Sequence, residues 1–366
     1  MRQPIDVAAF TEYVRVNVPV IKTPIRLNQF SHGQSNPTYE ITSATGQKFV
    51  LRKKPPGELI SRNAHRIERE YLVIKALEHT DVAVPKTYCL CEDVSVIGTP
   101  FYIMEFLDGR IFKDPWLPDL SPVERREIWK EALHTLGKLH KIDISAVGLS
   151  TLIKPTQFYS RQVQALSRVS ATQAKVRSVE TGQEVGELPY YDELVSFFSN
   201  ELLRPHNRKA LVHGDFKLDN LVFDKLKARV IGILDWEMAT EGHPLSDLMN
   251  LISPFSWSFK RMPMLVEYSL TEDLRELHEK FSSGNVDGIP SAEECFDWYQ
   301  NVAGWDPREG VDWALAFSNF RTAVIMQGIA ARLLKGQASG IKAKQYALQS
   351  LTYAIWSHAG IRSIKA

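Results

Sequence analysis

The chain has 366 residues, and its 44 Lys and Arg residues almost balance its 43 Asp and Glu residues, for a formal net charge of +1. Such a balance gives no strong field that would favour nucleic acid, an anionic membrane or acidic partners. Hydrophobic residues make up 44% and charged residues 24% of the chain, which is typical of a globular protein with one or two domains. The 3 cysteines exclude a disulfide scaffold, and no run of about 18 apolar residues predicts a membrane span.

The two ends of the sequence bear on location. The N-terminus lacks the apolar core of a signal peptide, and Asp6 and Glu12 make it a poor transit peptide. The last four residues, Ser-Ile-Lys-Ala, differ from the peroxisomal signal Ser-Lys-Leu. We therefore expect a cytoplasmic protein, with a mitochondrial or peroxisomal location left open.

The N-terminal part has the pattern of short strands around one helix. β-Favouring runs predict strands, and an apolar stripe at helical spacing predicts a helix. The strands are expected over residues 38–41, 48–52 and 101–103, and the helix over residues 62–79. The first two strands, with Gly46 between them, predict a hairpin. Asp108-Gly109 closes this part, so we expect one domain over residues 1–108 and a second over 109–366.

The second part is mainly helical. Ser121-Pro122-Val123-Glu124 predicts a capping box at a helix N-terminus, with Pro at the first helical position. Further helices are expected over residues 158–176, 191–203, 313–334 and 344–356, and two more strands over 220–223 and 230–234. The elements predict an α+β fold with a small sheet-bearing N-terminal part and a larger helical C-terminal part.

The most informative segment is residues 212–223, Val-His-Gly-Asp-Phe-Lys-Leu-Asp-Asn-Leu-Val-Phe, followed by a strand that ends at Leu234-Asp235-Trp236. A carboxylate such as Asp215 can orient or deprotonate a hydroxyl. Asn220 and Asp235 offer hard oxygen ligands for Mg²⁺. Either carboxylate alone is more often a turn or cap residue. Together, the spacing indicates phosphoryl transfer, which requires an oriented hydroxyl and metal neutralisation of phosphate charge.

On these residues the chain resembles the aminoglycoside phosphotransferase and choline kinase superfamily, which has a two-lobed protein-kinase-like fold. His213-Gly-Asp215 stands where protein kinases have H-R-D, and Leu234-Asp235-Trp236 stands where they have D-F-G. Within the superfamily, the chain looks most similar to phosphotransferase domains fused to acyl-CoA dehydrogenases. That similarity lies in residues 49–57, 67–71, 161–162, 328–332 and 336–338. The resemblance implies Asp215 as catalytic residue, Asn220 and Asp235 as Mg²⁺ ligands, and ATP or GTP as co-substrate.

The resemblance also implies nucleotide-binding residues in the N-terminal part. A loop with Gly33 and Ser35 would lay backbone N–H groups over phosphates, although its single glycine is equally typical of an ordinary turn. The segment with Met104, Glu105 and Leu107 corresponds to the hinge between lobes. There the Glu105 carbonyl and the Leu107 N–H would bind the purine edge.

A cation on the strand over residues 48–52 is expected to pair with the α- and β-phosphates and with a helix carboxylate. Arg52 stands at this position, where aminoglycoside kinases have Lys, and Lys53 is the alternative. Strand alternation places these two cations on opposite faces. The helix partner is expected to be Glu70, on the apolar stripe, with Glu68 left open.

Four further residues complete the hypothesis. His213 is expected to brace the catalytic loop, and Asp247 to support that loop from a helix, with a simple helix cap as the alternative. Arg321 and Arg161 are candidates for binding an anionic substrate, since a guanidinium can grip a carboxylate or phosphate with two hydrogen bonds. Either arginine can instead belong to a structural ion pair.

We therefore predict a Mg²⁺-dependent kinase that transfers the γ-phosphoryl group of ATP or GTP to a hydroxyl of a small molecule. The resemblance points to a hydroxyacyl acceptor, and the near-neutral charge gives no special reason to expect a polycationic aminoglycoside. An aminoglycoside-type antibiotic kinase and a non-catalytic pseudokinase or scaffold are the alternatives. The complete set Asp215, Asn220 and Asp235 argues against a pseudokinase. A protein kinase is disfavoured because no A-P-E segment follows Asp235.

Overall fold

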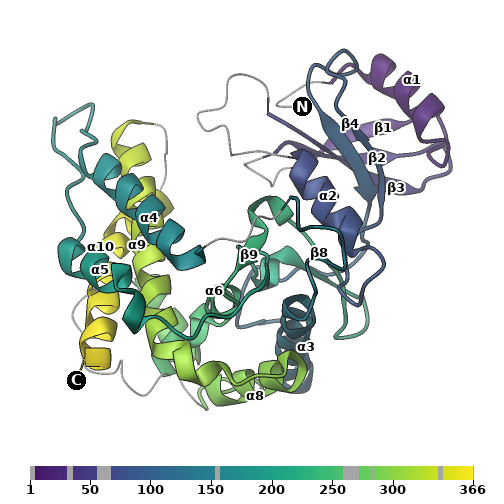
Figure 1. Ribbon diagram of the computed structural model, residues 1–366. Coiled ribbons are helices and arrows are strands. Elements are labelled where there is room, and N and C mark those ends of the chain that lie inside the picture. The colour runs from purple at the N-terminus through teal and green to yellow at the C-terminus, as the bar shows by residue number, and fades with distance from the viewer. Residues whose placement is uncertain are drawn as a thin grey trace. The chain divides into compact units, whose positions relative to one another are not determined.

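The computed structural model describes residues 5–30, 36–55, 67–152, 157–258, 272–281, 284–336 and 341–365. The chain divides into two compact units, of which the first comprises residues 1–113, 143–154 and 213–240, and the second 114–142, 155–212 and 241–366. The first unit contains an antiparallel sheet and the second is mostly helical (Figure 1). The predicted α+β fold is therefore confirmed, while the expected boundary after residue 108 stays a prediction.

A five-stranded antiparallel sheet forms the centre of the first unit, with the strand order β1-β2-β3-β5-β4. Its strands are β1 (Arg26–Gln29), β2 (Thr38–Thr42), β3 (Lys48–Lys53), β4 (Thr87–Cys91) and β5 (Phe101–Glu105). β2 and β3 form the predicted hairpin, in which Ile41 lies opposite Phe49. The short runs that become β1 and β4 carry no clear alternation, and sequence patterning does not predict them.

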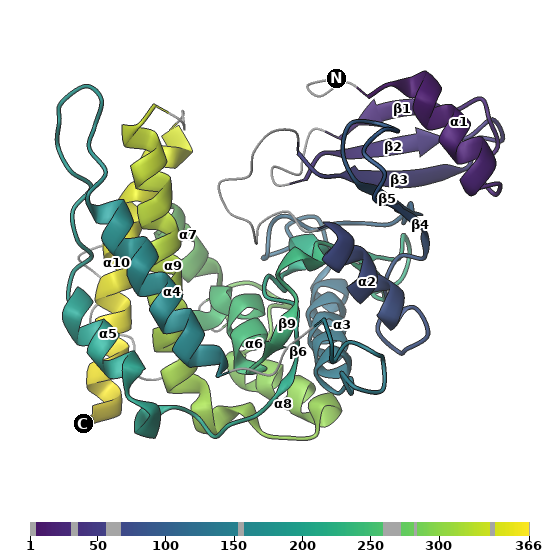
Figure 2. The same cartoon turned by 45° about the horizontal axis from the view of Figure 1, so that its top comes forward.

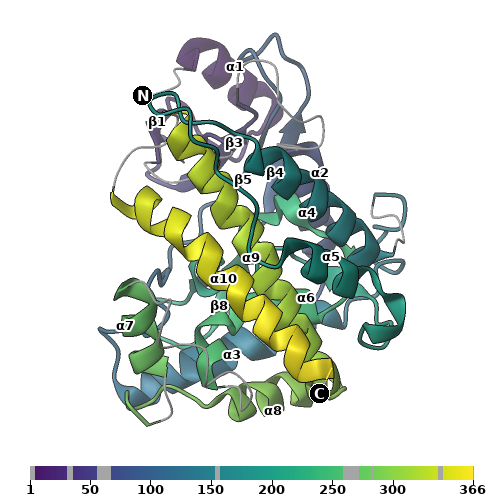
Figure 3. The same ribbon diagram turned by 90° about the vertical axis from the view of Figure 1, so that its left-hand side faces the viewer.

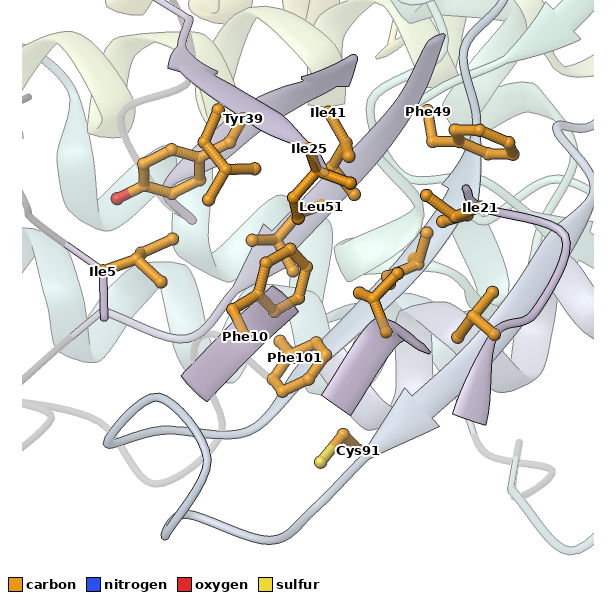
Figure 4. Packing of buried hydrophobic residues seen from close by; sticks show 14 residues of the cluster. Ile5, Phe10, Ile21, Ile25, Tyr39, Ile41, Phe49, Leu51, Cys91 and Phe101 are labelled. Atoms are coloured by element: carbon orange, nitrogen blue, oxygen red, sulfur yellow. The ribbon is translucent and has the colours of Figure 1, made fainter. Parts of the chain in front are cut away.

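Two helices pack against this sheet, α1 (Val7–Asn17) and α2 (Ile67–Leu77). Figure 2 shows α1 lying over β1, β2 and β3. Phe10 of α1 packs with Leu51 of β3 in a buried apolar cluster (Figure 4). α2 contacts the other face, where Tyr71 meets Tyr102 with 6.0 Å between ring centroids. Because side chains alternate along a strand, Arg52 faces α2 while its neighbour Leu51 faces α1.

The hairpin of β7 (Leu221–Phe223) and β8 (Val230–Ile233) also belongs to the first unit, as does the segment that follows β5. That segment pairs with the hairpin, since the backbone N–H and carbonyl of Arg110 exchange hydrogen bonds of 2.7 and 2.8 Å with Phe223. A Cβ atom at Gly109 would lie 2.2 Å from the Phe223 carbonyl oxygen, so this close approach requires glycine.

The second unit contains the longer helices and one small sheet. Its helices are α3 (Pro122–His140), α4 (Phe158–Ala174), α5 (Tyr191–Ser199), α6 (Leu245–Leu251), α7 (Glu272–Phe281), α8 (Ala292–Ala303), α9 (Val311–Leu334) and α10 (Ile341–Lys365). Short 3-10 turns are η1 (Glu201–Leu203), η4 (Ser253–Ser258) and η5 (Pro307–Gly310), and β6 (Ala210–Val212) pairs with β9 (Thr240–Gly242). As predicted, Ser121 caps α3 by accepting the Glu124 N–H at 3.3 Å.

Aromatic residues fill the interior between the helices of the second unit. α9 packs against both α10 and α4 (Figure 3). Trp313 and Phe317 of α9 stack on each other, with 5.2 Å between ring centroids, and both meet Tyr159 of α4 edge-on. Among the described residues, no helix is both long and apolar enough to cross a membrane.

Candidate active site

The three predicted residues Asp215, Asn220 and Asp235 all belong to the first unit. Asn220 ends the 3-10 turn η2 (Leu218–Asn220) directly before β7, and Asp235 follows the end of β8 by two residues. The Asn220 carbonyl accepts the Leu234 N–H at 2.9 Å. Antiparallel pairing of β7 with β8 therefore brings together two segments that are separate in the sequence.

Asn220 also fixes the position of Asp215. Its Nδ2 donates to the Asp215 carbonyl at 2.8 Å and to Asp215 Oδ2 at 3.0 Å. Since Nδ2 is used in this way, Oδ1 is the Asn220 atom suited to a metal ion. These two neighbouring side chains can therefore have different roles. Asp215 can accept a proton, and Asn220 can offer an oxygen ligand to a metal ion.

Lys217 is a neighbour that the sequence analysis misses. Its Nζ lies 3.4 Å from Asp215 Oδ2 and 3.5 Å from Asp219 Oδ2. Burial alone would lower the pKa of Lys217, but the two carboxylates outweigh this effect and raise it. Lys217 therefore places a positive charge beside Asp215. Its place two residues after Asp215 in the motif is the signal that would have found it.

His213 is buried between the two segments that carry the site. Its Nε2 lies 2.9 Å from the Leu234 carbonyl oxygen, and its Nδ1 accepts the Asp215 N–H at 3.2 Å. These contacts fix a neutral tautomer in which Nε2–H is the donor. Trp236 packs edge-on against the ring, with 4.7 Å between centroids. The geometry supports the expected bracing role, which stays a prediction.

Asp235 has an uncommon backbone conformation, with φ at 67° in the left-handed region. Asp tolerates this region better than most residues with a side chain, and such conformations gather at functional sites. Asp235 Oδ1 accepts a hydrogen bond from Arg52 Nη2 at 2.6 Å. The fold thus holds the carboxylate of Asp235 against a cation of the central sheet.

Arg52 connects Asp235 to α2. Its Nε lies 3.0 Å from Glu70 Oε2, and the two side chains are only 11% and 1% exposed. Glu68 pairs with Lys54 instead, at 3.5 Å. Lys53 is buried, which lowers its pKa, and alternation places it on the face opposite Arg52. Of the alternatives left open by the sequence, Arg52 and Glu70 are therefore the pair that meets.

The electrostatics of this pair follow from burial. Burial raises the pKa of Glu70 to about 7, although the positive charge of Arg52 opposes the shift. Burial alone would lower the pKa of Arg52, but Glu70, Tyr102 and Asp235 together raise it. Arg52 therefore remains a cation, with one carboxylate on α2 and another directly after β8.

The donor set of Asn220 and Asp235 fits Mg²⁺. Both offer oxygen atoms, and Asp235 uses Oδ1 for Arg52, so Oδ2 is available to a metal ion. Mg²⁺ binds a few protein oxygens and completes its octahedron with water and substrate phosphates. Bound there, the ion would neutralise phosphate charge during transfer.

The predicted hinge residues are Met104 and Glu105, which end β5, and Leu107, which follows it. The backbone N–H of Glu105 donates to the Lys86 carbonyl at 2.8 Å. The side chain of Leu107 fills the space over Gly232 of β8, where an added Cβ would lie 2.0 Å from Leu107 Cδ1. Met104 is buried at the end of the strand. The segment is thus fixed on the β7–β8 hairpin, and its contacts with a nucleotide stay a prediction.

Gly33 and Ser35 lie outside the described residues. The first residue described after them, Asn36, is buried, and its Nδ2 donates to Glu237 Oε2 at 3.3 Å. This contact joins the chain before β2 to the segment after Asp235. Sequence patterning does not single out Asn36 or Glu237, because the two are 201 residues apart.

Three predicted residues belong to the second unit. Asp247 of α6 is buried, with Oδ2 at 3.5 Å from His140 Nε2, and the Nδ1 of that histidine lies 2.7 Å from the Tyr299 hydroxyl. Arg321 is half-buried on α9, and Arg161 is exposed in the first turn of α4. The predicted loop support by Asp247 and substrate binding by the two arginines stay predictions.

Comparison with known proteins then decides the family. Residues 26–280 match the phosphotransferase enzyme family. The chain belongs to this family. The mouse protein acyl-CoA dehydrogenase family member 10 is 40% identical over 322 residues, which are 88% of this chain and 28% of that protein. This chain thus spans well under half of the length of that relative.

Solved structures of similar proteins agree with this family assignment. A crystal structure from Ralstonia eutropha, described as that of a candidate aminoglycoside phosphotransferase, has a TM-score of 0.77 at 33% identity and covers 98% of this chain and 99% of that chain. The streptomycin–ATP complex of APH(2'')-IIa has a TM-score of 0.57 at 16% identity, covering 94% and 98%, which shows the fold alone. The predicted family and kinase-like fold are confirmed, and membership supports phosphoryl transfer to small molecules in general.

Proposed function

We propose that this protein is a Mg²⁺-dependent kinase that transfers the γ-phosphoryl group of ATP or GTP to a hydroxyl of a small molecule. The observation that carries the proposal is the convergence of Asp215, Asn220 and Asp235 where the β7–β8 hairpin ends, with Arg52 bound to Asp235. A pseudokinase is expected to lack part of this set. The ATP present in the APH(2'')-IIa complex supports a nucleotide co-substrate.

Each residue has a role that its geometry permits. Asp215 would orient the acceptor hydroxyl and accept its proton, because Asn220 holds its carboxylate in place. Asn220 Oδ1 and Asp235 Oδ2 would hold Mg²⁺, which supplies charge neutralisation when bound. Arg52, fixed by Glu70, would place a guanidinium beside the nucleotide phosphates. Lys217 would place a positive charge beside Asp215.

We further propose a hydroxyacyl compound, such as a CoA thioester, as the acceptor. The support is the 40% identity to a relative named as an acyl-CoA dehydrogenase family member, together with a net charge of +1 that gives no acidic excess for a polycation. Arg321 and Arg161 stay the proposed partners of an anionic acceptor. The alternative is an aminoglycoside kinase, and the competition between acceptor classes described below distinguishes it from a hydroxyacyl kinase.

Nucleotide binding and turnover test the roles of the two carboxylates. Mg²⁺ with ATP or GTP at about 100 times Kd is expected to stabilise the protein by about 2.7 kcal/mol in thermal unfolding. Asp215→Asn is expected to keep this stabilisation and to lower kcat about 10²- to 10⁴-fold. Asp235→Ala is expected to lose both metal-dependent binding and turnover.

Asp219→Asn is the matched control, because Asp219 lies in the same loop, contacts the same lysine and is not among the proposed site residues. It is expected to retain both binding and turnover. Absence of stabilisation by either nucleotide at millimolar concentration would contradict the kinase proposal. Loss of nucleotide binding in a folded Asp215→Asn variant would contradict the division of roles.

The acceptor is tested by direct competition at equal concentration among hydroxyacyl-CoAs, hydroxy acids, aminoglycosides, choline-like amines and sugars. Saturable Mg²⁺-dependent phosphorylation of a hydroxyacyl compound is expected. Turnover of an aminoglycoside without turnover of any hydroxyacyl compound would overturn the proposed acceptor and leave the proposed catalytic residues intact.

A further inference from the structure

A second site, outside the proposed active site, is suggested by a pocket of about 700 Å³ in the second unit. It lies among the start of α4, η1, the segment over residues 204–209 and β9. Its volume falls within the range of about 300–1,000 Å³ that is usual for small-molecule sites. Every residue that lines it belongs to the second unit, whereas Arg52, Asp215, Asn220 and Asp235 belong to the first.

A smaller pocket of about 170 Å³ adjoins it and is lined by some of the same residues. Pro205, His206, Arg208 and His243 line both pockets, and Trp305 lines the smaller one. The segment over residues 206–209, His-Asn-Arg-Lys, contributes four consecutive polar residues to the larger pocket. Arg208 therefore lies in the wall that the two pockets share.

The carboxylates of the larger pocket already have partners. Glu201 Oε1 lies 3.1 Å from Arg204 Nη1, and Glu241 Oε1 lies 3.2 Å from Lys209 Nζ. In the smaller pocket, Glu309 Oε1 lies 3.2 Å from His206 Nε2. Three of the basic residues are thus matched by carboxylates.

Arg208 differs from these three. Its guanidinium carbon lies 4.5 Å from the centroid of the Trp305 ring, which indicates a cation–π contact. Across the described ranges of the chain, its side chain makes no hydrogen bond or ion pair. The ring contacts the guanidinium and leaves its N–H groups available to a ligand.

The backbone beneath Arg208 is held by a buried histidine. His243 Nε2 lies 3.0 Å from the His206 carbonyl oxygen, and its Nδ1 accepts the Leu245 N–H at 3.3 Å. Burial lowers the pKa of His243 to about 4, so the ring is a neutral donor to that carbonyl at physiological pH. The segment with Arg208 is therefore fixed before any ligand arrives, which lowers the entropic cost of binding.

We propose that this pocket binds a small phosphate-bearing anion through the N–H groups of the Arg208 guanidinium. A phosphate suits this wall because a guanidinium donates two parallel hydrogen bonds to two of its oxygens. The proposal goes beyond the proposed kinase function, since none of the residues assigned to catalysis lines the pocket. A phosphorylated metabolite that binds here would contact none of the residues proposed for catalysis.

Isothermal titration with inorganic pyrophosphate, without Mg²⁺, tests the proposal. Wild-type protein is expected to bind, and Arg208→Ala is expected to bind at least about tenfold more weakly, since one charged hydrogen-bonding group contributes about this much. Arg208→Lys, which keeps the charge but lacks the fork, is expected to fall between them. Trp305→Leu is expected to weaken binding because it removes the ring that contacts Arg208.

Arg177→Ala is the matched control, because Arg177 is an exposed arginine of the same unit that lines neither pocket. Its binding of pyrophosphate is expected to equal that of wild type. Arg52→Met reports on the proposed nucleotide site. If Arg52→Met abolishes binding while Arg208→Ala leaves it unchanged, the anion binds at the nucleotide site and the proposal is overturned. No binding to wild type at millimolar pyrophosphate would also overturn it.

Discussion

Arg52 in the first unit and Arg208 in the second are held in opposite ways. Arg52 is 11% exposed and has a carboxylate at each end, Glu70 at 3.0 Å and Asp235 at 2.6 Å. Arg208 is exposed and rests on one aromatic ring. A buried charge must have partners, so the fold itself fixes the geometry around Arg52. An exposed charge has no such requirement, so Arg208 is available for binding.

The largest effect on stability is expected from breaking the buried pair. Glu70→Gln removes the buried carboxylate on α2 and leaves Arg52 with Asp235 as its carboxylate partner. Removal of one partner of such a pair costs about 3–5 kcal/mol of the free energy of unfolding. Denaturation with urea, followed by circular dichroism, measures this loss.

Glu68→Gln is the control for this measurement. Glu68 lies on the same helix and pairs with Lys54 at 3.5 Å, and both side chains are about one quarter exposed. Partly exposed pairs contribute about 0–1 kcal/mol. Equal losses in the two variants would contradict the distinction between the Arg52 pair and an ordinary surface ion pair.

This pair also shows how far the sequence predicts the site. Alternation along residues 48–52 places Arg52 and Lys53 on opposite faces, and the structure confirms it. Glu70 lies on the apolar stripe of α2, but helix periodicity alone leaves Glu68 open. The family resemblance favours Glu70, and the ion pairs agree. The side-chain periods of a strand and of a helix are local properties, so they can be read from the sequence without knowledge of the fold. The spacing of the catalytic motif is local in the same way.

Contacts between distant segments could not be predicted in this way. Asn36 and Glu237 meet across 201 residues, and no periodicity links them. The larger pocket of the second unit is built from the start of α4, from residues 201–209 and from residues 241–243, which are also separate in the sequence. The role of His243 could not be predicted either, because it depends on a hydrogen bond to the His206 carbonyl, 37 residues away in the sequence. Such sites appear only after the chain has folded.

His243 is expected to have an effect on stability between those of the Arg52 pair and Arg208. Unlike Arg52, this buried group is kept neutral and has no ion-pair partner. Its pKa is about 4 in the folded protein, against 6.5 for an ordinary histidine, and burial is the main cause. The charges of His140 and Arg208 lower it further, while the bond to His206 opposes the shift. As pH falls, the unfolded chain binds this proton first, so stability present above pH 6.5 is lost towards pH 4.

Between pH 6.5 and pH 4 the free energy of unfolding is expected to fall by about 3 kcal/mol because of this histidine. Each unit of pKa difference contributes on the order of 1.4 kcal/mol. Urea denaturation at pH 7 and near pH 4.5 measures it. His243→Gln is expected to lower stability at pH 7 and to flatten the pH dependence. His79→Gln, at an exposed position, is the control and is expected to keep the wild-type slope. An unchanged slope in His243→Gln would show that the ring does not titrate as proposed.

The smallest effect is expected from Arg208 itself. An exposed cation–π contact is worth about 0.5–1 kcal/mol, and ordering a long side chain offsets part of it. Arg208→Ala is therefore expected to change the free energy of unfolding by less than about 1 kcal/mol, while pyrophosphate binding falls tenfold or more. Arg52→Met is expected to lose several kcal/mol, since it leaves Glu70 buried without a cation. Urea denaturation of both variants, beside the titration, measures the contrast. If Arg208→Ala lowers the free energy of unfolding by more than about 2 kcal/mol, Arg208 stabilises the fold as Arg52 does. That result would contradict the distinction between a structural and a ligand-binding arginine.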